Sequence, residues 1–320
     1  AHELTGVRNL TMAGGVALNC VANGKVLREG PFEQVWIQPA AGDAGGALGA
    51  ALFTWHELLD KPRQVNANDA QYGSLLGPKF TNDQIRAYLD SVEAVYHYHE
   101  RDDELIDHVA DLIASEQVVG HFSDRAEFGP RALGSRSIIG DARSRKMQAT
   151  MNLKIKFRES FRPFAPAVLR EDVDDFFEMR PQENSPYMLL VAPVKDSKRL
   201  PVEQDGAKGL DKLKQVRSSV PAITHVDYSA RVQTIDMQHH PRFYKIIERF
   251  KQKTGSPVVI NTSFNVRGEP IVNSPEDAFR CFMHTNMDAL VLENFVILKQ
   301  DQPNAKEIDI EAYLKEFALD

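Results

Sequence analysis

Apolar residues and glycines alternate in a regular order through the first sixty residues. Two apolar runs, residues 9–15 and 32–39, are each followed by a helical pattern that contains glycine, at residues 16–29 and 42–60. This order predicts strand, helix, strand, helix, which is the alternation of an α/β layer. The second helix is rich in Ala and Gly, which permit close backbone approach, so we expect it to be buried against a sheet or a twin helix.

The pattern changes after residue 60. Residues 61–80 have no apolar periodicity and hold several turn formers, which predicts a linker. A second α/β domain is predicted from residue 81 to residue 320, with a flexible insertion at residues 195–216. Its expected helices are residues 83–92, 102–117, 241–255 and 275–284, and its expected strands are residues 118–123, 164–169, 187–194, 231–236, 256–263 and 289–299.

Composition is that of an ordinary globular protein. Of the 320 residues, 42% are hydrophobic and 26% are charged, so a substantial core can be buried, and the length favours about two domains. No apolar run approaches the roughly 20 residues that span a bilayer. No secretory leader is evident either, so we expect a cytoplasmic protein without a membrane partner.

Cysteine and histidine give little sign of a metal centre. Cys20 and Cys281 are the only cysteines, which is too few for a disulfide scaffold and favours a reducing compartment. None of the ten histidines has another histidine four residues away, and the pairs at residues 97/99 and 239/240 are expected to be exposed. We therefore expect no complete metal site within this chain.

Charge is distributed unevenly along the chain. The net charge of −7 argues against nucleic acid as a partner, because polyanions are bound by basic surfaces. Between Arg143 and Arg162, however, seven residues are basic and only Glu159 is acidic. Such a local concentration favours a small anionic ligand.

Two glycine-rich turns carry candidate binding residues. Gly14 and Gly15 lie where a strand meets a helix, a place where free backbone N–H groups bind anions, and Asn19 and Asn23 would share one helix face. The second turn places Asp43 after a strand, where it would hold a cation or cap the helix. A purely structural turn is the alternative for the first, but two such turns in succession resemble a phosphate clamp.

The segment "EFGPRALGSRS", residues 127–137, sets Arg131 and Arg136 between a Gly-Pro and a Leu-Gly turn. Fixed turns aim guanidinium groups in set directions, which suits a bidentate grip on phosphate or carboxylate oxygens. The alternative is a structural ion pair with Asp124 or Asp141.

Further cations follow in "MNLKIKFRESFRPFAP" and in "THVDYSARVQT". Lys154, Lys156 and Arg158 are two residues apart and would project from one face of a strand, and Arg162 precedes a proline. Arg231 adds a cation from a distant part of the chain. A solvated basic strand edge is the alternative for the first group.

Polar groups suited to a nucleotide follow the strand in "VVINTSFNVRGEP". Asn261, Thr262, Ser263 and Asn265 offer hydroxyl and amide groups for phosphate oxygens or ribose, and Gly268 permits a close turn. An ordinary polar turn would contain such residues too.

These motifs, in this order and spacing, resemble the NodU/CmcH-type O-carbamoyltransferases. The likeness extends over residues 9–298 and is carried by "GPRALGSRS", "MNLKIKFRESFRPFAP", "THVDYSARVQT" and "NTSFNVRGEPIVNSPEDAF", while "AGGVALNCVANGKV" and "GDAGGALGAA" resemble the end of that family's N-terminal domain. The resemblance implies an α/β fold with a YrdC-like twisted-sheet domain at residues 81–320. Residues 1–60 would be the C-terminal portion of an actin/sugar-kinase-like (ribonuclease-H-like) domain, joined by the linker.

The resemblance further implies an ATP-dependent O-carbamoyltransferase. The YrdC-like domain would convert ATP and carbamoyl phosphate into carbamoyl-adenylate, releasing pyrophosphate and phosphate, and the first domain would transfer the carbamoyl group to an unknown acceptor hydroxyl. Magnesium would accompany ATP, and iron or a similar divalent ion would serve the transfer domain. The residues so assigned are Arg131, Arg136, Lys156, Arg158, Arg162 and Arg231 as anion contacts, Thr262, Ser263 and Asn265 as nucleotide contacts, Gly14, Gly15 and Asn19 as adenylate contacts in the second site, and Asp43 as one metal ligand.

Two departures from the family pattern bear on this assignment. The family's His-x-x-x-His metal pair would precede residue 1, which leaves Asp43 without its partners, and Asp124 stands where the family usually has Gly. The resemblance therefore implies an adenylating domain attached to the last part of a transfer domain. The alternatives are a nucleotide-binding module without turnover and a threonylcarbamoyl-adenylate-type component of tRNA modification. The chain could also form a homo-oligomer, and the sequence does not decide its oligomeric state.

Overall fold

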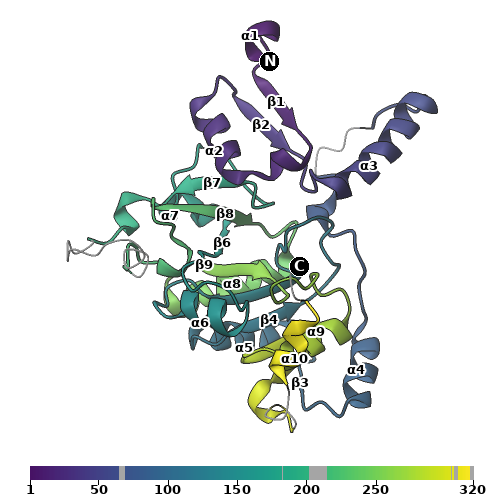
Figure 1. Cartoon of the computed structure of the whole chain (residues 1–320), viewed down its shortest axis with the longest axis vertical. Coiled ribbons are helices and arrows are strands. Elements are labelled where there is room, and N and C mark those ends of the chain that lie inside the picture. Colours follow the sequence, from purple (N-terminus) through teal and green to yellow (C-terminus); the bar gives the residue numbers. More distant parts are fainter. Residues whose placement is uncertain (65–68, 182, 202–214, 304, 306–308, 318–320) are drawn as a thin grey trace.

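Two sheets organise the chain. The computed structural model describes residues 1–64, 69–181, 183–201, 215–303, 305 and 309–317. Within these residues the strands form a parallel pair and a mixed sheet of nine strands. Figure 1 shows the pair and its helices at one end of the molecule, next to the larger sheet. The predicted mixed α/β class is confirmed at this level.

The first sheet and its helices come from the start of the chain. Strand β1 pairs with β2 in parallel, with Met12 opposite Ile37, as the predicted strand–helix alternation requires. The elements are α1 (His2–Thr5), β1 (Asn9–Met12), α2 (Cys20–Glu29), β2 (Gln34–Ile37) and α3 (Asp43–Phe53).

The helix expected over residues 16–29 is interrupted. A 3-10 helix, Gly15–Leu18, precedes α2, and the Asn19 side chain caps α2 by accepting a hydrogen bond (3.1 Å) from the Ala22 N–H. Asn23 is fully buried and donates to the carbonyl oxygens of Ala17 (2.8 Å) and Leu189 (3.0 Å). The Asn19 and Asn23 side chains thus have separate partners, and Asn23 ties α2 to the larger unit.

Helix α3 differs from its expectation. No residue of α3 is buried among the described residues, and a π-helical turn, Thr54–Leu58, continues it. Leu52 and Phe53 are 48% and 68% exposed, and α3 projects away from the rest of the molecule in Figure 1. The prediction that this Ala- and Gly-rich helix is buried was wrong for the described part of the chain, because small residues permit close packing but do not supply the partner.

The larger sheet is mixed, with strand order β3-β11-β10-β4-β5-β9-β6-β8-β7. Strands β4 and β10 are parallel, as are β6 and β8, and the other neighbours are antiparallel. The strands are β3 (His97–Tyr98), β4 (Val119–Phe122), β5 (Arg136–Asp141), β6 (Ala165–Leu169), β7 (Leu190–Pro193), β8 (Ser229–Ile235), β9 (Val258–Ser263), β10 (Ala289–Leu292) and β11 (Phe295–Leu298).

Sequence patterns predict most of these strands correctly. The exceptions are β3 and β5, which were not expected, and residues 289–299, which form a hairpin instead of one strand. The hairpin turn is Glu293–Asn294, and Glu293 has a positive φ of 47°. A turn of two residues inside an apolar run leaves little trace in the hydrophobic pattern.

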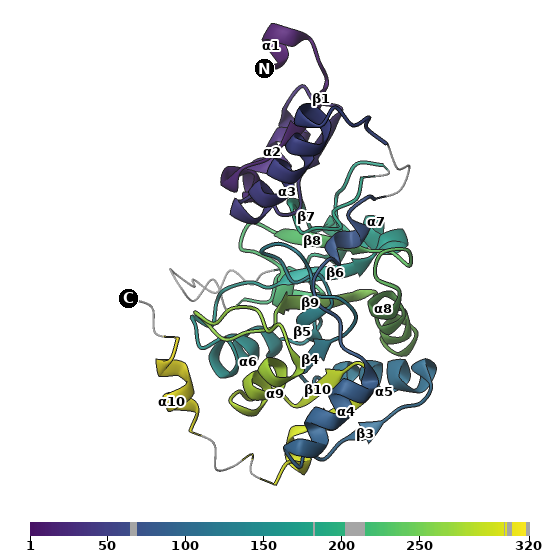
Figure 2. The same ribbon diagram turned by 90° about the vertical axis from the view of Figure 1, so that its right-hand side faces the viewer.

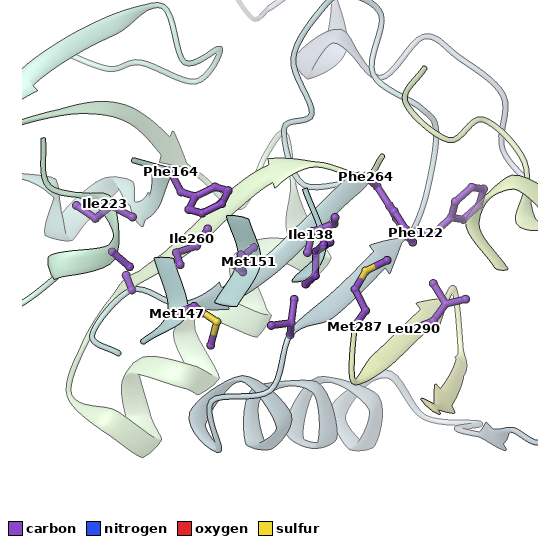
Figure 3. Close-up of a cluster of buried hydrophobic side chains, with 14 of the residues drawn as sticks. Phe122, Ile138, Met147, Met151, Phe164, Ile223, Ile260, Phe264, Met287 and Leu290 are labelled. Atoms are coloured by element: carbon purple, nitrogen blue, oxygen red, sulfur yellow. The ribbon is translucent and has the colours of Figure 1, made fainter. Parts of the chain in front are cut away.

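Helices cover both faces of the larger sheet. Alternate residues of each strand face opposite sides, so Val259 of β9 packs with α5 and α8 while Ile260 packs with α6 and α9. Figure 2 shows these two helix pairs on opposite sides of the strands, and Figure 3 shows Met147 and Met151 of α6 against Ile260 and its neighbours. The helices are α4 (Asn82–Ser91), α5 (Asp102–Ala114), α6 (Met147–Lys154), α7 (Val173–Phe176), α8 (Pro241–Thr254), α9 (Pro275–Met283) and α10 (Ile310–Lys315).

The segment predicted as a linker packs partly against the larger unit. Backbone hydrogen bonds join Gly77 and Pro78 to Ala126 (both 2.9 Å) and Ser74 to Phe128 (2.7 Å). The expected flexible insertion falls largely on residues 202–214, which lie outside the described residues. In the described part of the chain, no helix is both long and apolar enough to cross a membrane.

Gly134 gives a test of this packing. It has φ 126°, and an added Cβ would overlap the ring of Phe243 in α8. Gly255 at the end of α8 also has a positive φ (77°), but an added Cβ there would meet nothing within 4 Å. We expect Gly255→Ala to lower the free energy of unfolding by about 1 kcal/mol and Gly134→Ala by roughly 3 kcal/mol or more, measured by urea denaturation. Equal losses would contradict the close approach of Phe243.

Candidate functional site

The loop of residues 127–136 is held from inside by the Glu127 carboxylate. One oxygen, Oε1, accepts hydrogen bonds from the backbone N–H groups of Leu133 (2.7 Å), Ser135 (2.7 Å) and Arg136 (3.3 Å). The sequence motif contains Glu127, but no role was predicted for it. Three donors on one carboxylate oxygen fix the loop in a single conformation.

Buried amides hold the same loop through its carbonyl groups. Gln233 of β8 donates to the carbonyl of Leu133 (2.8 Å), and Asn261 of β9 donates to Gln233 Oε1 (2.7 Å). His121 Nδ1 lies 2.6 Å from the carbonyl oxygen of Gly134. Gln233, Asn261 and His121 are at most 1% exposed, so these bonds are shielded from water. Asn261, predicted among the ligand-binding polar residues, therefore contacts the protein.

Arg136 is buried and bonded to the backbone. Its guanidinium donates to the carbonyl oxygens of Ser123 (3.0 Å), Asp124 (3.2 Å), Ser135 (3.1 Å) and Pro78 (3.1 Å). It also lies 3.5 Å from the centre of the Phe122 ring. Burial lowers the pKa of Arg136 to about 10, which leaves it charged at neutral pH.

Arg136 forms neither of the two ion pairs considered from the sequence, with the carboxylate of Asp124 or with that of Asp141. The carboxylate of Asp141 instead pairs with Arg143 (2.7 Å), and that of Asp124 pairs with Lys79 (2.9 Å). Asp124 has a φ of 54°, in the left-handed region that glycine favours, so the residue that replaces glycine keeps the glycine conformation.

Three other arginines lie close enough for their charges to interact. Burial, together with the charges of Arg131 and Arg158, lowers the pKa of Arg231 to about 10. In the described residues, neither Arg131 nor Arg231 has a side-chain hydrogen bond or an ion pair, and Arg131 Nε is buried without a partner. Arg158 donates through Nε to Asn152 Oδ1 (2.6 Å) and lies 4.9 Å from the Phe164 ring centre. We call Arg131, Arg158 and Arg231 the arginine cluster.

Lys156 joins two of the predicted motifs. Its ammonium is buried and donates to Asn265 O and Oδ1 (both 2.8 Å), to Ser263 O and to Ser263 Oγ (3.2 Å). Burial lowers the pKa of Lys156 to about 7, whereas four acceptor oxygens favour the charged form. An ammonium has three protons, so these bonds use its whole donor capacity. Thr262 remains partly exposed, and its hydroxyl is unbonded within the described chain.

The strand expected to align Lys154, Lys156 and Arg158 does not exist. Helix α6 ends at Lys154, and Phe157 has a positive φ of 47°, so Lys154 is exposed while Lys156 is buried. Arg162 is half-exposed and pairs with Glu159 (3.3 Å). Its charge, after burial, lowers the pKa of Arg158, so Arg162 lies beside the arginine cluster.

The predicted residues of the first sheet form an open turn. Gly14 has φ 94° and donates to the carbonyl of Ala41 (2.7 Å), and a Cβ on Gly14 or Gly15 would meet nothing within 4 Å. Asn19 acts as the cap of α2, as the structural alternative held. The next residue, Cys20, is close enough to Arg231 to affect its pKa. The start of α2 therefore lies near the arginine cluster.

Asp43 has no second ligand beside it. It is exposed in the first turn of α3 without capping that helix. Among the residues that the structure describes, no group of three or more His, Cys, Asp or Glu residues gathers to hold a metal ion.

A cavity of about 500 Å³ is lined by chain neighbours of Arg162 and by His225, whose pKa the charge of Arg231 affects, although none of the three clustered arginines lines it. Two of its walls are the chain around Arg162 and the turn that precedes Arg231, and the pKa of His225 is lowered by burial and by the charge of Arg231. Its lining combines cationic, polar and aromatic side chains, including Arg145, Gln148, Phe161, Arg217 and His225, with apolar ones such as Val216 and Val226. The size and lining suit a polar ligand with a planar ring.

Two family sequence profiles match the chain. The profile described as Carbamoyltransferase C-terminus matches residues 110–299, and the one described as Carbamoyltransferase N-terminus matches residues 1–52. An uncharacterized protein of Synechocystis is 57% identical over the whole chain and 52% of its own length. Nodulation protein NolNO of Sinorhizobium fredii is 39% identical over 93% of this chain and 41% of its own length. The chain thus spans about half the length of the curated relatives it matches.

Among solved structures, full-length HypF in its phosphate- and nucleotide-bound form is a distant match. It aligns with a TM-score of 0.40 and 18% identity over 62% of this chain and 22% of that chain.

Like charges held together destabilise the protein unless an anion binds. We expect Arg231→Met to raise the free energy of unfolding by about 1 kcal/mol in phosphate-free buffer, because it removes a buried, unpaired charge. Arg143→Met is the control and should lower it by about 2 kcal/mol, because Asp141 would lose its partner. Inorganic phosphate should raise the melting temperature of the wild type but not of Arg231→Met. A destabilised Arg231→Met would contradict the unpaired state of the cluster.

Buried histidines should make the fold sensitive to acid. His240, expected to be exposed, is 4% exposed and His239 is partly buried, so that prediction was wrong for this pair, whereas His97 is exposed as expected. Burial lowers the pKa values of His121 and His240 from 6.5 to about 4. Between pH 6.5 and pH 4 these histidines bind protons in the unfolded chain but not in the folded chain. The free energy of unfolding therefore falls as the pH falls, by up to about 1.4 kcal/mol per pH unit for each histidine.

His121→Asn isolates this effect, because the Asn amide can still donate to the carbonyl of Gly134. Urea unfolding at pH 7 and pH 5 should show a smaller loss of stability for the variant than for the wild type. Parallel losses would mean that His121 does not titrate in this range.

Proposed function

The chain belongs to the carbamoyltransferase family, and from this premise we propose that the unit around its larger sheet activates carbamoyl phosphate with ATP. Water cleaves carbamoyl phosphate to carbamate and phosphate. A carbamate oxygen then attacks the α-phosphorus of ATP, so that carbamoyl-adenylate forms and pyrophosphate leaves. The carbamoyl group next passes to an acceptor hydroxyl, and AMP leaves.

The arginine cluster is the observation that carries this proposal. Arg131 and Arg231 are unpaired within the described chain, yet they share a region of positive charge with Arg158. Both substrates are phosphorylated, and negative charge builds up on their transferring groups in the transition state. Fixed cations stabilise such charge without any nucleophilic side chain.

The remaining cations take different roles in this proposal. Lys156 directs its protons at Ser263 and Asn265, so it contributes charge and holds their turn. Arg136 shapes the loop that presents Arg131. Arg162, half-exposed at the edge, can exchange Glu159 for a substrate oxygen.

The cavity that His225 lines supports a nucleotide site. Phe161 supplies a ring face for the base, and Arg145 and Arg217 supply charge for phosphates. Thr262 offers a free hydroxyl, and the Ser263–Asn265 turn is the further nucleotide contact. ATP would bring magnesium with it. We also keep a reducing, cytoplasmic setting as a proposal, which the free state of both cysteines supports.

The second site is proposed at the open turn of Gly14 and Gly15, near the cap residue Asn19. The proximity of Cys20 to Arg231 supports a short path for the adenylate from the arginine cluster. A divalent ion in a complete transfer site would take Asp43 as one ligand. The described residues around Asp43 do not form a metal site by themselves, so no step is derived through a metal there.

Pyrophosphate release tests the proposal directly. The purified chain mixed with ATP, Mg²⁺ and carbamoyl phosphate should release pyrophosphate, and Arg131→Met should lower the rate at least about 100-fold, because a fixed cation at the reacting oxygens is lost. Lys154→Met is the control, because Lys154 is an exposed cation at the end of α6. Its rate should match the wild type, and circular dichroism checks that α6 stays folded.

The outcomes separate the candidate functions. Equal rates for Arg131→Met and the wild type would exclude the arginine cluster as the reaction site. ATP binding without pyrophosphate release would favour a nucleotide-binding module. Dependence on threonine and bicarbonate in place of carbamoyl phosphate would favour the tRNA-modification alternative.

A further inference from the structure

One amide fixes the turn that follows β9. Asn265 donates through Nδ2 to the carbonyl of Glu269 (2.7 Å), so its Oδ1 faces the opposite way. There Oδ1 accepts from Lys156 (2.8 Å) and from Ser263 Oγ (2.6 Å). Because an amide has distinct donor and acceptor ends, the bond to Glu269 decides which atom Lys156 meets.

Glu269 in turn is held by the C-terminal helix. Its Oε2 accepts from the Val266 N–H (2.7 Å), and its Oε1 accepts from the hydroxyl of Tyr313 in α10. Tyr313 is 2% exposed, and burial, followed by the nearby acidic groups, raises its pKa, so it remains a donor at neutral pH. A chain of hydrogen bonds therefore runs from α10 through Glu269 and Asn265 to Lys156.

Helix α10 is docked by several independent contacts. The Tyr313 ring stacks on His284 at 4.4 Å between ring centres, and Glu316 pairs with Arg280 of α9. Gly268, inside the turn, lies directly against the carbonyl of Phe317, where a Cβ would not fit. Figure 2 shows α10 beside α9, at the edge of the molecule. The turn is thus enclosed between β9 and α10.

We propose that Tyr313 is a positioning residue of the adenylating site, acting through Glu269 on Asn265 and Lys156. The inference rests on the proposed function, because that function assigns Ser263 and Asn265 to the nucleotide. If the Tyr313 hydroxyl is lost, the Glu269 carboxylate loses its link to α10 and keeps the bond from the Val266 N–H within the turn, so the turn is less firmly fixed. Lys156 then loses the fixed orientation of two of its four acceptors.

Tyr313→Phe tests this role, because it removes the hydroxyl and keeps the ring that packs on His284. We expect kcat/KM for pyrophosphate release to fall about tenfold, the effect of one hydrogen bond to a charged group. Tyr244→Phe is the matched control, since Tyr244 donates to Glu171 on the far side of the sheet, and its kcat/KM should change less than about twofold.

Two further measurements separate positioning from lost stability. Melting temperatures show whether the two tyrosine variants are destabilised alike, and ATP affinity, measured by calorimetry, should fall in Tyr313→Phe alone. Glu269→Gln keeps one acceptor oxygen and should retain more activity than Glu269→Ala. An unchanged kcat/KM and ATP affinity in Tyr313→Phe, or equal losses in both tyrosine variants, would overturn the inference.

Failure of the proposed function has a different signature. In that case the wild type itself releases no pyrophosphate, while the positioning role would still be tested by ATP affinity in Tyr313→Phe against Tyr244→Phe. Active wild type with an equally active Tyr313→Phe overturns only the positioning role.

Discussion

The burial of one charged side chain, Arg136, sets the conditions for the whole candidate site. A buried guanidinium needs hydrogen-bond acceptors from the protein, and here its two terminal nitrogens donate to backbone carbonyls on three separate segments. These segments can satisfy it only in one arrangement. Glu127 meets the matching need of the loop's N–H groups. Loss of any member would leave the others buried and unbonded, so the loop behaves as one cooperative unit that carries Arg131.

A rigid loop makes the electrostatic cost of the arginine cluster tolerable. Arg131, Arg158 and Arg231 repel one another, and flexible side chains would relieve the repulsion by turning to solvent. Arg231 lies in β8, Arg131 in the loop before β5, and Arg158 in the segment between α6 and β6, and the two cores of the larger sheet keep these elements in place. In the proposed function, the repulsion lowers the stability of the folded protein locally, and in return the arginines are already in place when an anion binds.

Sequence reasoning succeeded where one segment carries its own signal. Apolar runs predict most strands, and the glycine turns and grouped cations point to the region that the fold assembles. It failed where distant parts of the chain determine the structure. Strand β5 has only Ile138 and Ile139 as adjacent apolar core residues, which is too short a run to predict a strand. The exposure of α3 depends on which other elements pack against it. Gln233 and Glu269 were missed because their partners are distant in sequence or unremarkable as a motif. Arg131 and Arg136 have equivalent surroundings in the sequence motif, and their different roles became evident only from their different burial in the structure.

What distinguishes the two kinds of arginine is therefore the identity of their acceptors. Arg136 bonds to backbone carbonyls, which every chain supplies and which no ligand can displace without unfolding the loop. The side chains of Arg131 and Arg231 have no protein acceptor in the described chain. A fold that bonds both terminal nitrogens of one buried guanidinium to its own backbone, and leaves the guanidinium groups of Arg131 and Arg231 unbonded by the described residues, supports the proposal that those two bind an acceptor from outside. In the proposed function this acceptor is a phosphate group, whose oxygens and double charge match two forked donors at once.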